Sequence, residues 1–178
     1  AHTFGVQNFT CPMDGEVFEQ QMDMSVTQFG TMLDLKPIGP IAAPWSLPVC
    51  PSSQFVMYRT FTPEEIEILK RFVASTDYIN IKDEAIYYRV AQLKRLMQEP
   101  AKEIAMTLLQ ATWQARSNEE YARYAKEALV TFNLLLIDQS KGSKDWITNQ
   151  LIILELERRL SLFEAAEARL ASLKTTEM

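Results

Sequence analysis

Apolar residues recur at every third or fourth position through most of the chain after residue 62. Ile86, Val90 and Leu93 show this spacing, and so do Tyr121 and Ala125. Side chains at this period lie on one face of an α-helix. The pattern therefore predicts six helices, over residues 63–75, 84–98, 101–115, 118–138, 143–160 and 163–175.

Two of the predicted helices begin with residues that commonly cap helices. Thr62 is followed by a proline and then by Glu64 and Glu65, which places an N-cap, a first-turn proline and acidic residues in the favoured order. Asn118 is a suitable N-cap for the helix that begins there. Because short connections separate most of the helices, we expect them to pack as antiparallel hairpins.

The first third of the chain has a different composition. Six of the eight prolines and four of the five glycines precede residue 60, so strands, turns and loops are expected here. Short strands are predicted over 17–22, 31–35 and 55–61. The sequence thus predicts a mainly α, α+β fold with two domains, a loop-rich and β-rich unit over 1–61 and a helical hairpin domain over 62–178.

Two cysteine segments are similar to parts of a metal site. Cys11-Pro-Met-Asp-Gly and Cys50-Pro-Ser-Ser resemble the two Cys-Pro-x-Cys-Gly knuckles of a zinc ribbon, in which each knuckle supplies two thiolates. Asp14 and Ser53 stand where the second cysteine of each knuckle would be. Because serine is a weak zinc ligand, we expect this degenerate ribbon to hold neither a metal nor another cofactor.

The ribbon likeness also implies a pairing for the cysteines. Two sulfur ligands of one zinc ion, each about 2.3 Å from it, lie about 3.8 Å apart, so a ribbon without metal brings two thiols together. We expect a disulfide between Cys11 and Cys50, with two buried, reduced cysteines as the alternative. The disulfide would close a loop of about 40 residues and contribute about 4 kcal/mol.

Further resemblances concern the helices and the whole chain. Residues 160–170 resemble the turn and second helix of a tetratricopeptide repeat, although Ser161 stands where that family prefers glycine, and an irregular stack of helical hairpins is the alternative. The chain as a whole resembles an uncharacterised bacterial family that joins a CPxC…CPxC zinc ribbon to tetratricopeptide-like helices. That resemblance implies a fold and no established activity.

The same resemblance suggests a location. A metal-free variant with a disulfide implies an oxidising compartment, so we expect an exported protein of the periplasm or cell surface. The first residue, Ala1, is consistent with cleavage of a signal peptide, and equally with removal of an initiator methionine. A cytoplasmic location is the alternative.

Composition excludes several classes of function. With 18 basic and 23 acidic residues, a net charge of −5 does not support electrostatic binding of nucleic acid. No stretch approaches the length of apolar residues that a membrane-spanning helix needs. The single histidine is near the N-terminus, so a general base for a serine or cysteine nucleophile is missing. We therefore expect that the protein is not an enzyme. A hydrolase based on carboxylates is a further hypothesis without a specific motif.

Aromatic residues remain as candidates for contacts with a partner. Tyr87 and Tyr121 occupy core positions of their helices, which makes Tyr88 and Tyr124 the better candidates for the surface. The alternative, which the periodicity favours, is that all these aromatic residues are core residues between hairpins. Trp45 lies in an apolar, turn-rich segment that predicts a second contact surface. The sequence thus predicts a non-enzymatic, protein-binding scaffold or accessory subunit of a larger assembly. The alternative is a protein that handles a small ligand or metal through the degenerate ribbon.

Overall fold

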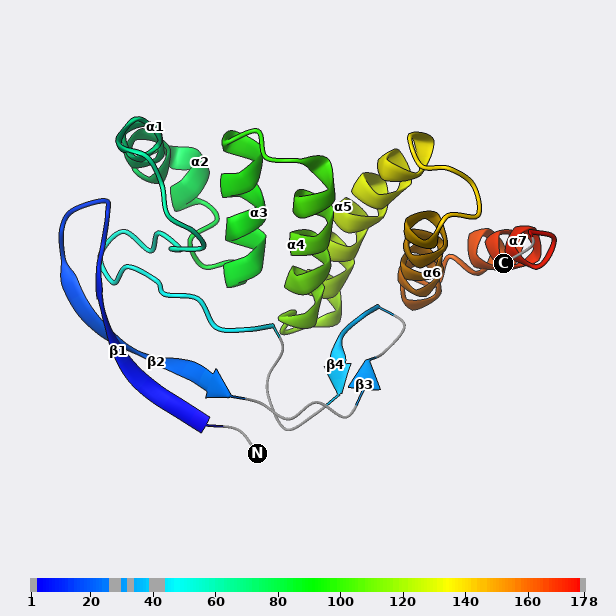
Figure 1. Cartoon of the computed structure of the whole chain (residues 1–178), viewed down its shortest axis with the longest axis horizontal. Coiled ribbons are helices and arrows are strands. Elements are labelled where there is room, and N and C mark those ends of the chain that lie inside the picture. Colours follow the sequence, from blue (N-terminus) through cyan, green and yellow to red (C-terminus); the bar gives the residue numbers. More distant parts are fainter. Residues whose placement is uncertain (1–2, 26–29, 32–33, 39–43, 177–178) are drawn as a thin grey trace.

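A computed structural model describes residues 3–25, 30–31, 34–38 and 44–176. In these ranges short strands precede a row of helices (Figure 1). The strands are β1 (Thr3–Thr10), β2 (Val17–Ser25), β3 (Gly30–Thr31) and β4 (Pro37–Ile38). The helices are α1 (Pro63–Val73), α2 (Thr76–Ile79), α3 (Ile86–Leu96), α4 (Ala101–Trp113), α5 (Asn118–Ile137), α6 (Lys144–Arg159) and α7 (Phe163–Lys174). The prediction of a mainly α, α+β fold is confirmed.

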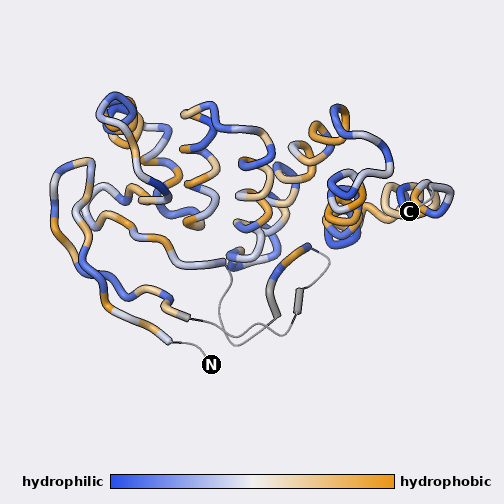
Figure 2. Tube along the Cα trace, viewed as in Figure 1, coloured by the Kyte–Doolittle hydropathy of each residue, from blue (hydrophilic) through white to orange (hydrophobic). Residues whose placement is uncertain are grey.

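The six predicted helices are all present, and their ends agree with the prediction to within two residues. Periodicity did not reveal α2, because a helix of four residues is too short to show a repeat. In Figure 2 apolar and polar positions alternate along the helices, as expected for helices with one buried face. Neighbouring helices from α3 to α7 pack against one another in chain order.

The cap predicted for α1 is confirmed and the cap predicted for α5 is wrong. The Thr62 side chain accepts from the Glu65 backbone N–H at 3.2 Å, and the Glu65 carboxylate accepts from the Thr62 N–H at 2.9 Å. These reciprocal bonds form a capping box. At α5 the N-cap is Ser117, whose side chain accepts from the Glu120 N–H at 3.1 Å. Asn118 is already the first helical residue.

The strand predictions are confirmed only in part. β2 pairs with β1 in an antiparallel hairpin, with Phe9 opposite Phe18. β1 was not predicted, because its apolar residues do not alternate strictly with polar ones. The strand expected over 55–61 is wrong, since Val56 forms only an isolated bridge with Val49. The strand expected over 31–35 overlaps β3 at Thr31, and residues 32–33 lie outside the described part.

Two main clusters of buried side chains form the interior. One joins α3, α4, α5 and α6, and its largest members include Leu108, Leu109, Phe132, Ile152, Ile153 and Leu156. The other joins the first 61 residues to α1, α2 and α3, and it includes Cys11, Phe18, Cys50, Phe55, Leu69, Tyr78 and Leu93. The N-terminal segment is therefore packed on the first helices through a shared interior, and it runs along one side of the helical row (Figure 1).

The described helices also bear on the prediction that the chain has no membrane span. Within the described ranges, none of the helices combines the length and apolar content that crossing a bilayer requires.

Candidate functional site

The two predicted cysteines are joined in a disulfide. Cys11 and Cys50 are bonded through their sulfur atoms, with their Cα atoms 5.6 Å apart and a separation of 39 positions in sequence. Both are buried, with exposed fractions of 1% and 0%. The predicted disulfide is confirmed, and the alternative of two reduced cysteines is wrong.

The turns that follow these cysteines have the same backbone geometry. In the first turn the Cys11 N–H donates to the Glu16 carbonyl and the Gly15 N–H donates to the Cys11 carbonyl, both at 2.8 Å. The turn after Cys50 repeats both bonds at 2.9 Å. The fifth residue of each turn, Gly15 or Gln54, has a positive φ. The two turns thus form a matched pair with the disulfide between them.

The residues that replace the second cysteine of each knuckle bond to their own turns. Asp14 Oδ1 accepts from the Glu16 N–H at 2.9 Å, and Ser53 Oγ accepts from the Phe55 N–H at 3.2 Å. Ser53 Oγ also lies 4.0 Å from Cys11 Sγ. Since the sulfurs are bonded to each other and both oxygens accept backbone hydrogen bonds, this set does not fit a zinc ion. The described residues contain no cluster of three or more histidine, cysteine or acidic side chains placed to hold a metal.

The second turn is attached to the helices through one carbonyl oxygen. The Gln54 carbonyl accepts from the Tyr78 hydroxyl of α2 at 2.5 Å and from Arg89 Nη1 of α3 at 2.8 Å. Tyr78 and Arg89 are buried, with exposed fractions of 1% and 5%. Burial raises the pKa of Tyr78, so its hydroxyl remains a donor at neutral pH. These bonds orient α2 and α3 relative to the disulfide.

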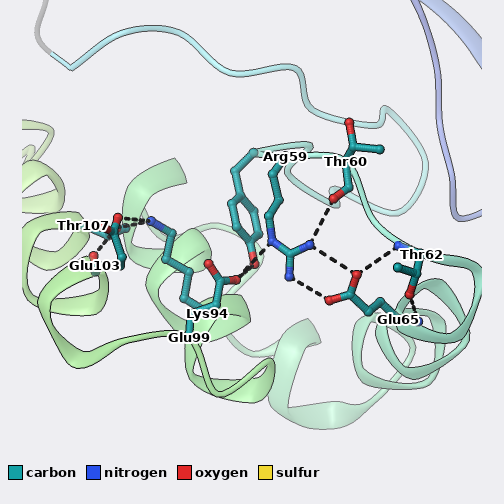
Figure 3. A network of polar contacts seen from close by, with 9 residues as sticks. Arg59, Thr60, Thr62, Glu65, Lys94, Glu99, Glu103 and Thr107 are labelled. Atoms are coloured by element: carbon teal, nitrogen blue, oxygen red, sulfur yellow. Dashed lines mark hydrogen bonds and ion pairs between the residues drawn. The ribbon is translucent and has the colours of Figure 1, made fainter.

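A polar network links the segment before α1 to the connection between α3 and α4 (Figure 3). Arg59 contacts the Glu65 carboxylate at 2.9 Å, the Thr60 carbonyl at 3.0 Å and Glu99 at 3.4 Å. The Tyr58 hydroxyl donates to Glu99 as well. Arg59 lowers the pKa of Glu65 to about 2, and the backbone hydrogen bond at Thr62 adds to that effect. The network thus connects the segment before α1 to the residues that precede α4.

Trp45 lies at the surface, as predicted. It is 42% exposed and lines a cavity of about 360 Å³ together with Phe4, which is 56% exposed, and Tyr87. The Tyr87 hydroxyl donates to the Trp45 carbonyl at 2.6 Å, which fixes this segment against α3. Trp45 therefore keeps the exposure that a contact residue needs.

The expected surface position of Tyr124 is wrong. Tyr124 is fully buried, its ring stacks on that of Tyr88 at 4.7 Å, and its hydroxyl donates to Glu84 and accepts from the Ala85 N–H at 3.0 Å. Tyr124 follows the buried Tyr121 by three positions, so both lie on the same side of α5. Tyr88, the other tyrosine expected at the surface, is half-buried.

Sequence reasoning overlooked a second apolar stripe on α5. Val130, Leu134 and Ile137 are exposed at 61%, 58% and 76%. Leu134 and Ile137 also line a hollow of about 420 Å³ that includes Ala101 at the start of α4. Their spacing of four and three residues was a usable signal for a helix face. It was missed because the apolar residues on the opposite face of α5 already explained how the helix packs on the core.

Comparisons with models of known protein families, with curated proteins and with solved structures gave no match. The resemblance to a bacterial family of ribbons and tetratricopeptide-like helices stays a prediction from the sequence. The functional assignment consequently depends on the geometry of this chain.

Proposed function

We propose that this protein is a non-enzymatic scaffold or accessory subunit that binds another protein through its row of helices. The observation that supports the proposal is the exposed stripe of Val130, Leu134 and Ile137 on α5. Apolar side chains gathered on one exposed helix face are typical of contact sites.

The stripe is uncovered because it faces away from the side of α5 that buries Ala125, Ala128 and Phe132. α5 has 20 residues and its antiparallel neighbour α4 has 13. At 1.5 Å per residue these helices are about 30 Å and about 20 Å long, so roughly 10 Å of α5 extends beyond α4. Leu134 and Ile137 of the stripe belong to this C-terminal part of α5, which is largely apolar in Figure 2.

The stripe is suited to a partner that presents apolar side chains. Burying one leucine or valine side chain contributes about 1.5–3 kcal/mol, so covering the three side chains of the stripe would favour a contact with a partner. Leu151 of α6, which is 36% exposed, is another apolar residue on the same row of helices. A partner that covers the stripe would complete the packing of α5.

The proposal is tested with two matched variants. Leu134→Asp places a charge in the stripe, whereas Val17→Asp changes an exposed apolar residue of β2, which is not part of the stripe. Each protein is isolated under gentle conditions from the cells that naturally produce it, and its native mass is compared with 20.4 kDa for one chain. We expect the wild type and Val17→Asp to retain a partner and Leu134→Asp to lose it. A single-chain mass for all three proteins would contradict the proposal, as would an unchanged complex with Leu134→Asp.

We also propose that the protein is located outside the cytoplasm. The buried Cys11–Cys50 disulfide supports this location, because such bonds persist in oxidising compartments. The test is rapid acid quenching of intact cells followed by thiol alkylation and mass measurement of the chain. Alkylation of both cysteines in the quenched cells would contradict the proposal.

A further inference from the structure

A second, basic cavity lies where α4 ends, α5 begins and α6 ends. Its volume is about 640 Å³, which is in the range of small-molecule sites. Its described lining contains no acidic residue and five cationic ones: Lys36, Arg116, Lys126, Arg158 and Arg159. This concentration of positive charge stands out in a chain with a net charge of −5.

The positive charge of the lining is only partly compensated. The arginines pair with carboxylates outside the lining, Arg116 with Glu120 at 3.0 Å, Arg158 with Glu155 at 2.6 Å and Arg159 with Asp34 at 3.4 Å. Lys36 and Lys126 have no ion-pair partner within the described ranges. The carboxylates orient the arginines, and the two lysines leave an excess of positive charge for a ligand.

Two buried donors in the wall of the cavity lack acceptors. Trp113 Nε1 and the Tyr121 hydroxyl are both inaccessible and without a hydrogen-bond partner among the described residues. Both residues line the cavity, and Tyr121 as a whole is 9% exposed. An indole N–H can only donate, and a buried donor without an acceptor is destabilising. Because neither atom is accessible, a ligand in the cavity reaches these donors with its acceptor atoms only if the two side chains shift toward it.

The surroundings of Tyr121 keep it a donor and fix a neighbouring cation. Burial raises the pKa of Tyr121 to about 12, so the hydroxyl carries its proton at neutral pH. The Arg159 guanidinium lies 4.2 Å from the centre of the Tyr121 ring, a cation–π contact that holds Arg159 against the wall.

The start of α5 adds a further positive contribution. Ser117 and Asn118 line the cavity and form the N-terminal end of this 20-residue helix. The N-terminus of a helix carries the positive end of its dipole and favours anions.

We propose that this cavity binds a small ligand that consists of or carries a phosphate group. Arginine side chains match the geometry of phosphate oxygens, the lysines supply uncompensated charge, and the two buried donors need acceptors. A cavity of about 640 Å³ favours a small molecule over an acidic peptide. This inference goes beyond the proposed binding of a protein, because the cavity and the α5 stripe share no residue.

Calorimetric titration of the full chain tests the proposal, with inorganic phosphate, pyrophosphate and adenosine monophosphate as probes at constant ionic strength. We expect one site per chain for at least one probe. The double variant Lys36→Gln, Lys126→Gln should weaken binding at least tenfold. The matched control Lys102→Gln, Lys141→Gln removes two exposed lysines outside the cavity and should bind like the wild type.

A second variant separates ligand binding from folding. Tyr121→Phe deletes a hydroxyl that has no partner in the described protein, so the melting temperature of the free protein should not fall. The affinity for the probe should fall severalfold, because the ligand loses a donor. The proposal is overturned if no probe binds, if the cavity and control lysine variants bind equally, or if only a triglutamate peptide binds.

Discussion

Gln54 occupies in the second cysteine turn the position that Gly15 occupies in the first, and both have a left-handed backbone, with φ of 62° and 76°. Glycine adopts this conformation without steric cost, whereas a residue with a Cβ atom adopts it only with strain. The turn nevertheless forms at Gln54, whose carbonyl accepts hydrogen bonds from Tyr78 and Arg89. Interactions with α2 and α3 thus hold a conformation that the local sequence does not favour.

Replacing Gln54 with glycine should stabilise the protein. We expect Gln54→Gly to raise the free energy of unfolding by about 1 kcal/mol, because it removes the strain of the left-handed backbone. The hydrogen bond from the Gln54 side chain to the Pro51 carbonyl at 2.9 Å is lost, but it lies at the surface. Urea unfolding measures the change.

The matched control is Gly15→Ala in the first turn. No atom lies within 4 Å of the added Cβ, so any effect comes from the backbone alone. We expect a loss of about 1 kcal/mol. Destabilisation by both substitutions would contradict the equivalence of the two turns.

The hydroxyl of Tyr78 should contribute measurably to stability. Tyr78→Phe removes the 2.5 Å hydrogen bond to the buried Gln54 carbonyl, and we expect a loss of about 1 kcal/mol. Thermal or urea unfolding provides the measurement. Tyr121→Phe is the control, since that hydroxyl has no partner in the described structure and its removal should not destabilise the protein. Equal losses for the two variants would refute this interpretation.

Reduction of the disulfide should destabilise the protein strongly. The bond spans 39 residues in sequence, and we expect its loss to lower the free energy of unfolding by about 4 kcal/mol. Intact mass should rise by two hydrogens on reduction, and unfolding is then compared with and without a reductant. A double Cys11→Ala, Cys50→Ala variant, whose stability should not respond to the reductant, is the control. An unchanged mass would show that the cysteines are not paired.

The pair of Arg59 and Glu65 should make stability depend on pH in the acid range. The pKa of Glu65 is lowered from its ordinary value of 4.5 to about 2. Stability from a lowered carboxyl pKa is fully present above 4.5 and is lost as the pH falls through about 2. Glu65→Gln should thus lower the melting temperature at pH 7, and its difference from the wild type should shrink between pH 4.5 and pH 2.

Glu64→Gln is the control for that pH profile. Glu64 is an exposed carboxylate in the same first turn of α1, but Arg59 bonds to Glu65. We expect Glu64→Gln to keep most of the pH dependence of the wild type. An identical profile for Glu65→Gln and the wild type would argue against the ion pair.

Helix positions and the disulfide were predictable because their determinants are local or repeated. The capping box of Thr62 and Glu65 depends on residues three apart, and each helix carries its own apolar period. The pairing of Cys11 with Cys50 followed from the likeness of two short segments to ribbon knuckles. These features can be predicted without knowing which helices pack against each other.

The buried position of Tyr124 and the basic cavity were decided by tertiary packing. The spacing of Tyr124 from Tyr121 is compatible with the buried side of α5, but the groups that contact it, the Tyr88 ring and Glu84, come from outside this helix. The cavity joins Lys36, Arg116 and Arg159, which lie far apart in sequence and meet only through the packing of α4, α5 and α6 with the N-terminal segment. The sequence by itself determined the six longer helices and the capping box of α1 through interactions between near neighbours. Only the tertiary structure decided which polar groups were buried and brought together, because burial depends on elements that are distant along the chain.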